Sequence, residues 1–375
     1  MALDFGTIIF ASVILGRVIL PLFIIRWPLP AIIASLVLDA VDQTIFQQFT
    51  TRDLAGYQGY DKALDIYYLS VAYISSLRNW VNLDAFRVDR FLYYYRLVGV
   101  LLFEMLHWRP LLLIFPNTFE YFFIFYEVLR ARWDPKRFAM KFWVVAAALI
   151  WIVIKLPQEY WIHVAQMDVT DFVKETLFGV PATASFGEAI AARPWVVVVA
   201  LAAVAVIVLV AWRLMKRLPP ADHRWRFKAD PLPADTDELS ERLALASRGG
   251  WFGRGLIEKI VLVGLISVIS AQILPNVRST KVAIIVQAAV IVAANALVSQ
   301  LLARRRIGWE SGLLHFLSML AVNAAILAGE LWLLPLNGGE VSVGNLAFLL
   351  LLITLIVTLY DRNRVVYDAR LSASR

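Results

Sequence analysis

The stretches AAALIWIVI (residues 146–154) and LLLLITLIVTLY (residues 349–360) decide the fold class of this chain. Both are continuous apolar runs, whereas a strand of a membrane β-barrel would alternate apolar and polar residues. Hydrophobic residues make up 60% of the 375 residues, and the mean hydropathy is +0.69. Soluble domains are only about 45 to 50% apolar. The sequence therefore predicts an all-α, polytopic integral membrane protein.

About eleven segments are long enough to cross roughly 30 Å of hydrocarbon as helices of about 20 residues. They begin near Phe5, Pro28, Tyr60, Phe91, Pro110, Phe138, Trp195, Leu256, Lys281, Gly312 and Val341. Basic residues gather at 130–141, 213–228, 304–306 and 362–364, and alternating spans place all four groups on one side. The positive-inside rule makes that side cytoplasmic. We expect a cell-membrane protein with its amino terminus outside and its carboxyl terminus in the cytoplasm.

Composition divides the chain into three parts. Residues 1–164 are rich in aromatic and charged side chains and hold six expected spans, whereas residues 195–375 hold five aliphatic spans and a cytoplasmic loop at 218–253. Residues 165–194 form a polar extracytoplasmic connector, in which DVTDFVKETLF (168–178) has the spacing of a short amphipathic helix. In the loop, DELSERLALAS (237–247) predicts a surface helix. No internal repeat relates the two halves, which counts against a symmetric carrier.

Ionisable side chains inside the early spans point to function, because a charge in hydrocarbon costs at least about 2.5 to 3.5 kcal/mol. Asp39 and Asp42 are three residues apart and share one helical face. Two such carboxylates repel unless a bound cation, a shared proton or a cationic partner intervenes. Arg17 should lie at similar depth in the neighbouring span, and a purely structural salt bridge from Arg17 to Asp39 is an equal alternative. Asp65 lies one turn deeper than Asp61, which we expect in water at the helix start.

Two spans end in a carboxylate and an imidazole. Glu104 and His107 lie at the outer end of the fourth span, and Glu159 and His163 at the outer end of the sixth. Such pairs can ligate zinc, manganese or iron, although interfacial residues beside aromatic belts are the structural alternative. His107, Glu159 and His163 are therefore candidate metal ligands. A divalent metal ion is the one cofactor that the sequence suggests.

Pro116 interrupts the fifth span just before Asn117 and Glu120. A proline inside a helix frees backbone carbonyls, and such breaks line ion or substrate cavities in membrane proteins. Arg96 is the expected partner of Glu120, in either a structural or a functional pair.

The topology sends several of these groups to the outer leaflet. They are Asp42, Asp65, Glu104, His107, Glu159 and His163. We therefore expect an acidic cavity between spans two to six that opens outward. The residues expected to bind a cation or a substrate there are Arg17, Asp39, Asp42, Asp65, Arg96, Glu104 and Glu120.

Three functions fit these observations. The first is a transporter that uses the acidic cavity for proton or cation coupling, and the second is a membrane enzyme that acts on a lipid-linked substrate at the outer leaflet. The third is a non-catalytic membrane scaffold subunit. Membrane lipids and either a small solute or a lipid-linked molecule are the expected partners, and self-association is left open. The net charge of +7 follows from topology and does not predict nucleic-acid binding.

Overall fold

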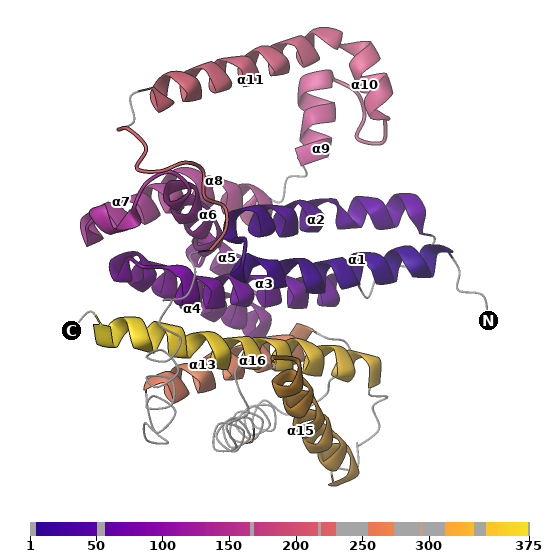
Figure 1. Cartoon of the computed structure of the whole chain (residues 1–375). Coiled ribbons are helices and arrows are strands. Elements are labelled where there is room, and N and C mark those ends of the chain that lie inside the picture. The colour runs from indigo at the N-terminus through magenta and orange to yellow at the C-terminus, as the bar shows by residue number, and fades with distance from the viewer. Residues whose placement is uncertain are drawn as a thin grey trace.

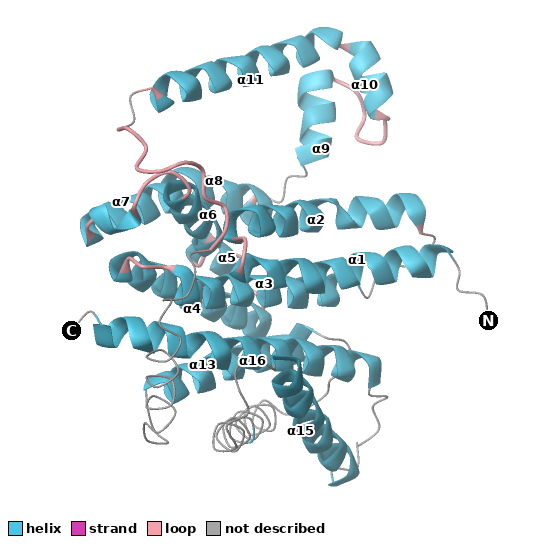
Figure 2. Ribbon diagram, viewed as in Figure 1, coloured by secondary structure: helices cyan, strands magenta, loops and turns pink. Residues whose placement is uncertain are grey.

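The computed structural model describes residues 5–50, 57–165, 169–216, 219–229, 254–273, 294, 312–333 and 343–373. These residues form helices and connecting turns, and no strand occurs among them (Figure 2). The predicted all-α class is confirmed.

The helices follow one another in an order that Figure 1 labels along the chain. The first part contains α1 (Phe5–Leu22), α2 (Pro28–Phe49), α3 (Tyr57–Asn79), α4 (Leu83–Leu106), α5 (Pro110–Ile114), α6 (Thr118–Arg130), α7 (Met140–Leu149) and α8 (Leu156–Glu159). Short helical turns are η1 (Phe23–Ile25) and η2 (Pro135–Arg137), and π-helical segments are η3 (Ile150–Lys155) and η4 (Tyr160–Val164). The remaining elements are α9 (Val169–Phe172), η5 (Val173–Phe178), α10 (Phe186–Ala192), α11 (Pro194–Met215), α13 (Arg254–Ile273), α15 (Gly312–Leu333) and α16 (Val343–Ala373).

Four helical stretches of the described residues are long and apolar enough to cross a membrane. They are Phe5–Ile25, Pro28–Phe46, Pro110–Arg130 and Met140–Val164. Helices α10 and α11 meet at 95° and make a fifth if the bent pair counts as one span. These helices are compatible with a multi-pass membrane protein. The expected span near Lys281 lies outside the described residues, and the count of eleven stays a prediction.

Helix α3 lies at the centre of the bundle. Every residue from Ile66 to Leu77 is at most 5% exposed, so this stretch of the helix is buried on all sides. It packs against α1, α4 and α13 and most extensively against α16. Residues of α13 and α16 therefore share one hydrophobic core with the first part of the chain, although the two parts differ in composition.

Aromatic rings fill much of this core. Tyr73 of α3 stacks on Tyr93 of α4 with ring centroids 4.4 Å apart. Trp80, which follows α3, stacks on Tyr126 of α6 at 3.6 Å. Aromatic pairs contribute about 0.5 to 1.5 kcal/mol beyond the burial of their area. The aromatic richness of the first part thus serves packing around α3.

The connector between the two parts is helical. Residues 169–215 form α9, η5, α10 and α11, which pack mainly on one another around Phe178, Ala189 and Val196. Figure 1 shows this group set apart from the bundle. The helix expected at 168–178 is confirmed over Val169–Phe178, where it turns from α-helical to π-helical. The helix expected at 237–247 lies outside the described residues.

Candidate functional site

A close approach of α1 and α2 positions the first candidate residues. The two helices are joined by the short turn η1 and run side by side (Figure 1). A side chain at Gly16 would place its Cβ 3.1 Å from Leu38 Cδ2, so the glycine allows α2 to approach here. Arg17 and Asp39, the next residue on each helix, are thereby brought into contact.

Arg17 is the centre of a cluster of acidic side chains. Its guanidinium donates from Nη1 to Asp42 at 2.5 Å and from Nη2 to Asp65 at 2.6 Å, and it also binds Asp39 and Asp61. Two of these carboxylates come from α2 and two from α3. The four aspartates, Arg17 and Tyr57 are called the Arg17 cluster below.

Tyr57 completes this cluster at the start of α3. Its hydroxyl accepts a hydrogen bond from Arg17 Nη1 at 3.1 Å and donates one to Asp42. The side chains of Arg17 and Asp42 are each only 3% exposed, whereas those of Asp39, Asp61 and Asp65 are 28, 32 and 41% exposed. The cluster therefore has one buried carboxylate and three that reach the surface of the bundle.

The charges in the Arg17 cluster do not balance. One guanidinium faces four carboxylates, and the nearest lysine in sequence, Lys62, instead binds Glu104 at 2.8 Å. Carboxylate oxygens of Asp39, Asp61 and Asp65 all lie within 4.8 Å of one another. Two unit charges at that distance repel by about 3.5 kcal/mol at an effective dielectric constant of about 20. Protons or a further cation would lower this repulsion.

Glu104 and His107 do not form the pair that their spacing suggested. Glu104 is buried and binds Lys62, whose ammonium also lies 5.3 Å from the ring centre of Phe103. His107 ends α4 in the left-handed conformation, with φ of 51°, and its side chain is exposed. The turn at His107 carries it away from the regular helical position that the prediction assumed.

The break at Pro116 is confirmed and organises a second polar group. Helix α5 ends at Ile114 and α6 begins at Thr118. Glu120 accepts hydrogen bonds from the Tyr68 hydroxyl at 2.6 Å and from Asn117 Nδ2 at 2.7 Å. The expected pairing of Arg96 with Glu120 is wrong. Arg96 donates instead to the backbone carbonyl of Phe115 at 3.0 Å, because the break leaves that carbonyl available.

Glu159 of the neighbouring helix α8 also forms a hydrogen bond with the backbone at this break. It accepts the backbone N–H of Asn117 at 3.2 Å, one of the donors that the start of α6 leaves unpaired. His163 Nε2 lies 3.0 Å from Glu159, so their predicted proximity is confirmed. Glu159 and His163 lie against the α5–α6 break, whereas Glu104 binds Lys62 of α3. The carboxylates and histidines predicted from the sequence therefore form separate groups.

Sequence reasoning missed two members of the Arg17 cluster. Asp61 was expected in water, but it shares Arg17 with Asp65. Their spacing of four residues places both on one face of α3, and this signal could have included Asp61. Tyr57 gave no such signal, because a tyrosine at a helix start is common near a membrane interface.

A further charged network was also missed in the aliphatic part of the chain. Glu258 of α13 binds Arg364 of α16 and accepts a hydrogen bond from Tyr73 of α3. Lys259 binds Asp361 at 2.7 Å. These contacts tie three helices of the core together. They were not foreseen because their partners are separated by about a hundred residues or more in sequence.

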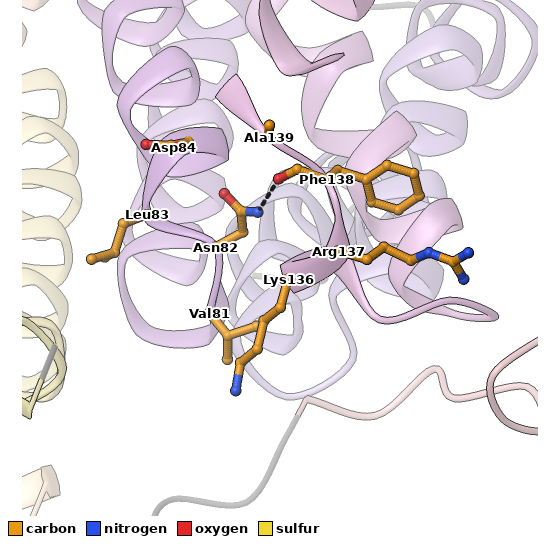
Figure 3. A pocket seen from close by; sticks show the side chains of 8 residues that line it. All are labelled: Val81, Asn82, Leu83, Asp84, Lys136, Arg137, Phe138 and Ala139. Atoms are coloured by element: carbon orange, nitrogen blue, oxygen red, sulfur yellow. Dashed lines mark hydrogen bonds between the residues drawn. The ribbon is translucent and has the colours of Figure 1, made fainter. Parts of the chain in front are cut away.

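A pocket of about 420 Å³ lies between the α3–α4 turn and the α6–α7 turn. Figure 3 shows Asn82 at its centre, with its amide directed to the carbonyl of Phe138. This amide also donates to the carbonyl of Pro135, and the Asn82 side chain caps α4 by accepting the N–H of Ala85. Because these bonds satisfy Asn82 internally, its role is to hold the two turns together. The Arg17 cluster remains the stronger candidate site.

Comparison with protein-family models, with curated proteins and with solved structures gave no match.

Proposed function

We propose that this protein is a multi-pass membrane transporter that couples movement of its substrate to protons bound at the Arg17 cluster. The carrying observation is that four carboxylates surround one guanidinium. A cluster with this excess of acids has positions where protons can be gained and lost. Ionisable groups inside a membrane protein commonly serve proton relays and ion pathways.

The membrane topology is part of the proposal. About eleven spans, an outer amino terminus and a cytoplasmic carboxyl terminus in the cell membrane follow from the basic groups in the sequence. The start of α1 and the end of α16 lie on opposite sides of the bundle in Figure 1, which agrees with an odd number of spans. In this topology the Arg17 cluster faces the outer half of the membrane. Its three partly exposed aspartates are then the groups that an external proton or substrate reaches first.

Protons suit this site better than a metal ion does. Arg17 already contacts one oxygen of each aspartate, so a metal ion would have to use the remaining oxygens beside an existing positive charge. Protons can bind these remaining oxygens without displacing the guanidinium. A substrate with a cationic group could replace such a proton, which would couple the two movements.

Charge movement tests this function whichever substrate the protein carries. Proteoliposomes adsorbed on a solid-supported membrane are exposed to a rapid pH change, and the displaced charge is recorded. We expect a transient current in the wild type that is lost in Asp65→Asn and strongly reduced in Asp39→Asn. Asp84→Asn is the matched control, because Asp84 contacts Arg87 at the start of α4, which follows the end of α3 opposite to Asp61 and Asp65. Wild-type currents in a folded Asp65→Asn protein would reject the proposal.

A metal-dependent enzyme acting on a lipid-linked substrate at the outer leaflet is the second candidate. The proximity of Asp39, Asp61 and Asp65 favours it, since hard oxygen ligands suit Mg²⁺, Mn²⁺ and Ca²⁺. These residues would hold the ion, which would polarise a substrate oxygen or activate water. Mn²⁺ binding followed by electron paramagnetic resonance separates the candidates. Tight Mn²⁺ binding that Asp61→Asn abolishes would favour the enzyme. If Asp39→Asn, Asp61→Asn and Asp65→Asn all behave like the wild type in both assays, a scaffold is favoured.

A further inference from the structure

Residues 219–229 form a loop that is fixed to the bundle. It follows α11, and Figure 1 shows it returning from the end of that helix towards α6. The backbone N–H of Asp222 donates to Arg132 at 3.0 Å, and that of Arg226 donates to Ala131 at 3.1 Å. Ala229 N–H donates to the carbonyl of Arg26 at 2.8 Å. We call these residues the basic-aromatic loop.

Side chains add to this attachment. Asp222 contacts Arg137 at 3.1 Å and accepts the backbone N–H of Asp134 at 2.8 Å. Arg130 donates to the carbonyl of Lys228 at 3.2 Å. The single acidic side chain of the loop is thus engaged with the bundle.

The fixed loop presents two aromatic rings outward. Trp225 is 57% exposed and Phe227 is 43% exposed, although exposed rings are costly in water. Their centroids lie 5.7 Å apart with an interplanar angle of 15°, so they form one stacked pair. Arg132 lies over this pair, with its guanidinium carbon 4.8 Å from the ring centre of Trp225. An ordered, exposed aromatic pair is typical of an interaction surface.

Basic side chains surround this pair. Arg224, Arg226 and Lys228 alternate with the two rings, and all three residues are exposed. The loop also begins just beyond the end of α11, a 22-residue apolar helix. Lys216 lies 3.5 Å from the ring centre of Trp212 there, a pairing common where helices leave a bilayer.

We propose that the basic-aromatic loop binds the headgroups of anionic phospholipids in the cytoplasmic leaflet. Trp225 and Phe227 enter the interface between headgroups and acyl chains, and Arg224 and Lys228 contact lipid phosphates. Charge complementarity selects this occupant, since the inner leaflet attracts basic segments close to membrane spans. The backbone bonds support binding because the loop is ordered before the lipid arrives.

Lipid retention measured by native mass spectrometry tests this assignment on the full chain. The protein in detergent is titrated with phosphatidylglycerol or phosphatidylcholine. We expect Arg224→Gln with Lys228→Gln to weaken phosphatidylglycerol binding about 30-fold, the effect of two basic side chains at a membrane surface, and to leave phosphatidylcholine binding unchanged. Trp225→Ala with Phe227→Ala should weaken binding of both lipids.

Matched controls lie elsewhere on the molecule. Arg87→Gln removes an exposed arginine that contacts Asp84, and Trp108→Ala removes an exposed tryptophan beyond α4. Neither should change lipid retention. Equal retention of both lipids by the wild type, or unchanged phosphatidylglycerol binding in the double basic variant, would overturn the proposal. Displacement of the lipid by inorganic phosphate alone would also overturn it, because the site would then recognise free phosphate. None of these results depends on the Arg17 cluster.

Discussion

Replacing Arg17 with glutamine tests whether the guanidinium is what allows the acidic cluster to exist. Asp42, whose side chain is 3% exposed, would lose its cationic partner inside the bundle. Removing one partner of a buried ion pair costs about 3 to 5 kcal/mol. The mutual repulsion of the remaining aspartates, about 3.5 kcal/mol for each ionised pair, adds to this until protons bind. We expect Arg17→Gln to lose at least about 3 kcal/mol of stability at neutral pH.

The free energy of unfolding is measured by SDS titration in mixed lipid and detergent micelles, followed by tryptophan fluorescence. The deficit of Arg17→Gln should shrink in acid, because protons then neutralise the carboxylates that the guanidinium no longer contacts. The free energy of unfolding of Arg17→Lys should lie between those of the wild type and Arg17→Gln. An ammonium keeps the positive charge but lacks the planar guanidinium that reaches several carboxylates. Adding Asp42→Asn to Arg17→Gln should restore part of the loss.

Either of two results would contradict this expectation. The free energy of unfolding of Arg17→Gln could differ from that of the wild type by no more than about 0.5 kcal/mol, the range of ordinary surface substitutions. Alternatively, its deficit could be independent of pH and unaffected by Asp42→Asn. Either outcome would mean that the four carboxylates are not held together by Arg17.

Further predictions concern the helix break, its carboxylate and the docked loop. Gly99→Ala would place its Cβ 2.0 Å from Phe115 Cβ, and the same SDS titration should show that the free energy of unfolding falls by at least about 1 to 3 kcal/mol. A wild-type free energy of unfolding would mean that the neighbouring residues relieve this contact at no cost. Tyr68→Phe removes the 2.6 Å hydrogen bond to the buried carboxylate of α6 and should cost about 1.5 to 3 kcal/mol in that assay. The backbone N–H of Asp134 holds the pKa of Asp222 below its ordinary value of 3.8, so this carboxylate favours docking above that pH. Amide hydrogen exchange of the loop, taken relative to the intrinsic exchange rate at each pH, should therefore rise as the pH falls through this lowered pKa, and the step should vanish in Asp222→Asn.

The sequence predicted the helical class well because continuous apolar runs have one structural solution in a bilayer. It also placed Arg17, Asp39 and Asp42 together, since both helices and their depth follow from span boundaries. The break at Pro116 was equally visible, as proline removes a backbone donor wherever it occurs in a helix. Local rules therefore sufficed wherever neighbouring spans or single residues determined the outcome.

Side-chain partners across several helices could not be predicted in this way. The choice of Lys62 by Glu104, and of the Phe115 carbonyl by Arg96, depends on helix rotations that hydropathy does not report. Glu258 and Arg364 meet because α13 and α16 pack on each other as well as on α3. Span counting gave no information on which helix would be central.

The burial of α3 has a consequence for how the chain is made. This helix carries Asp61, Lys62, Asp65 and Arg78, so its own partitioning into lipid is poor, yet its most extensive packing partner is α16 at the far end of the sequence. The ribosome delivers α16 after all the other described helices. We therefore expect α3 to remain incompletely enclosed throughout synthesis, sheltered only by its early neighbours, and a chain released before Val343 to be degraded by quality-control proteases even though the Arg17 cluster has been fully translated.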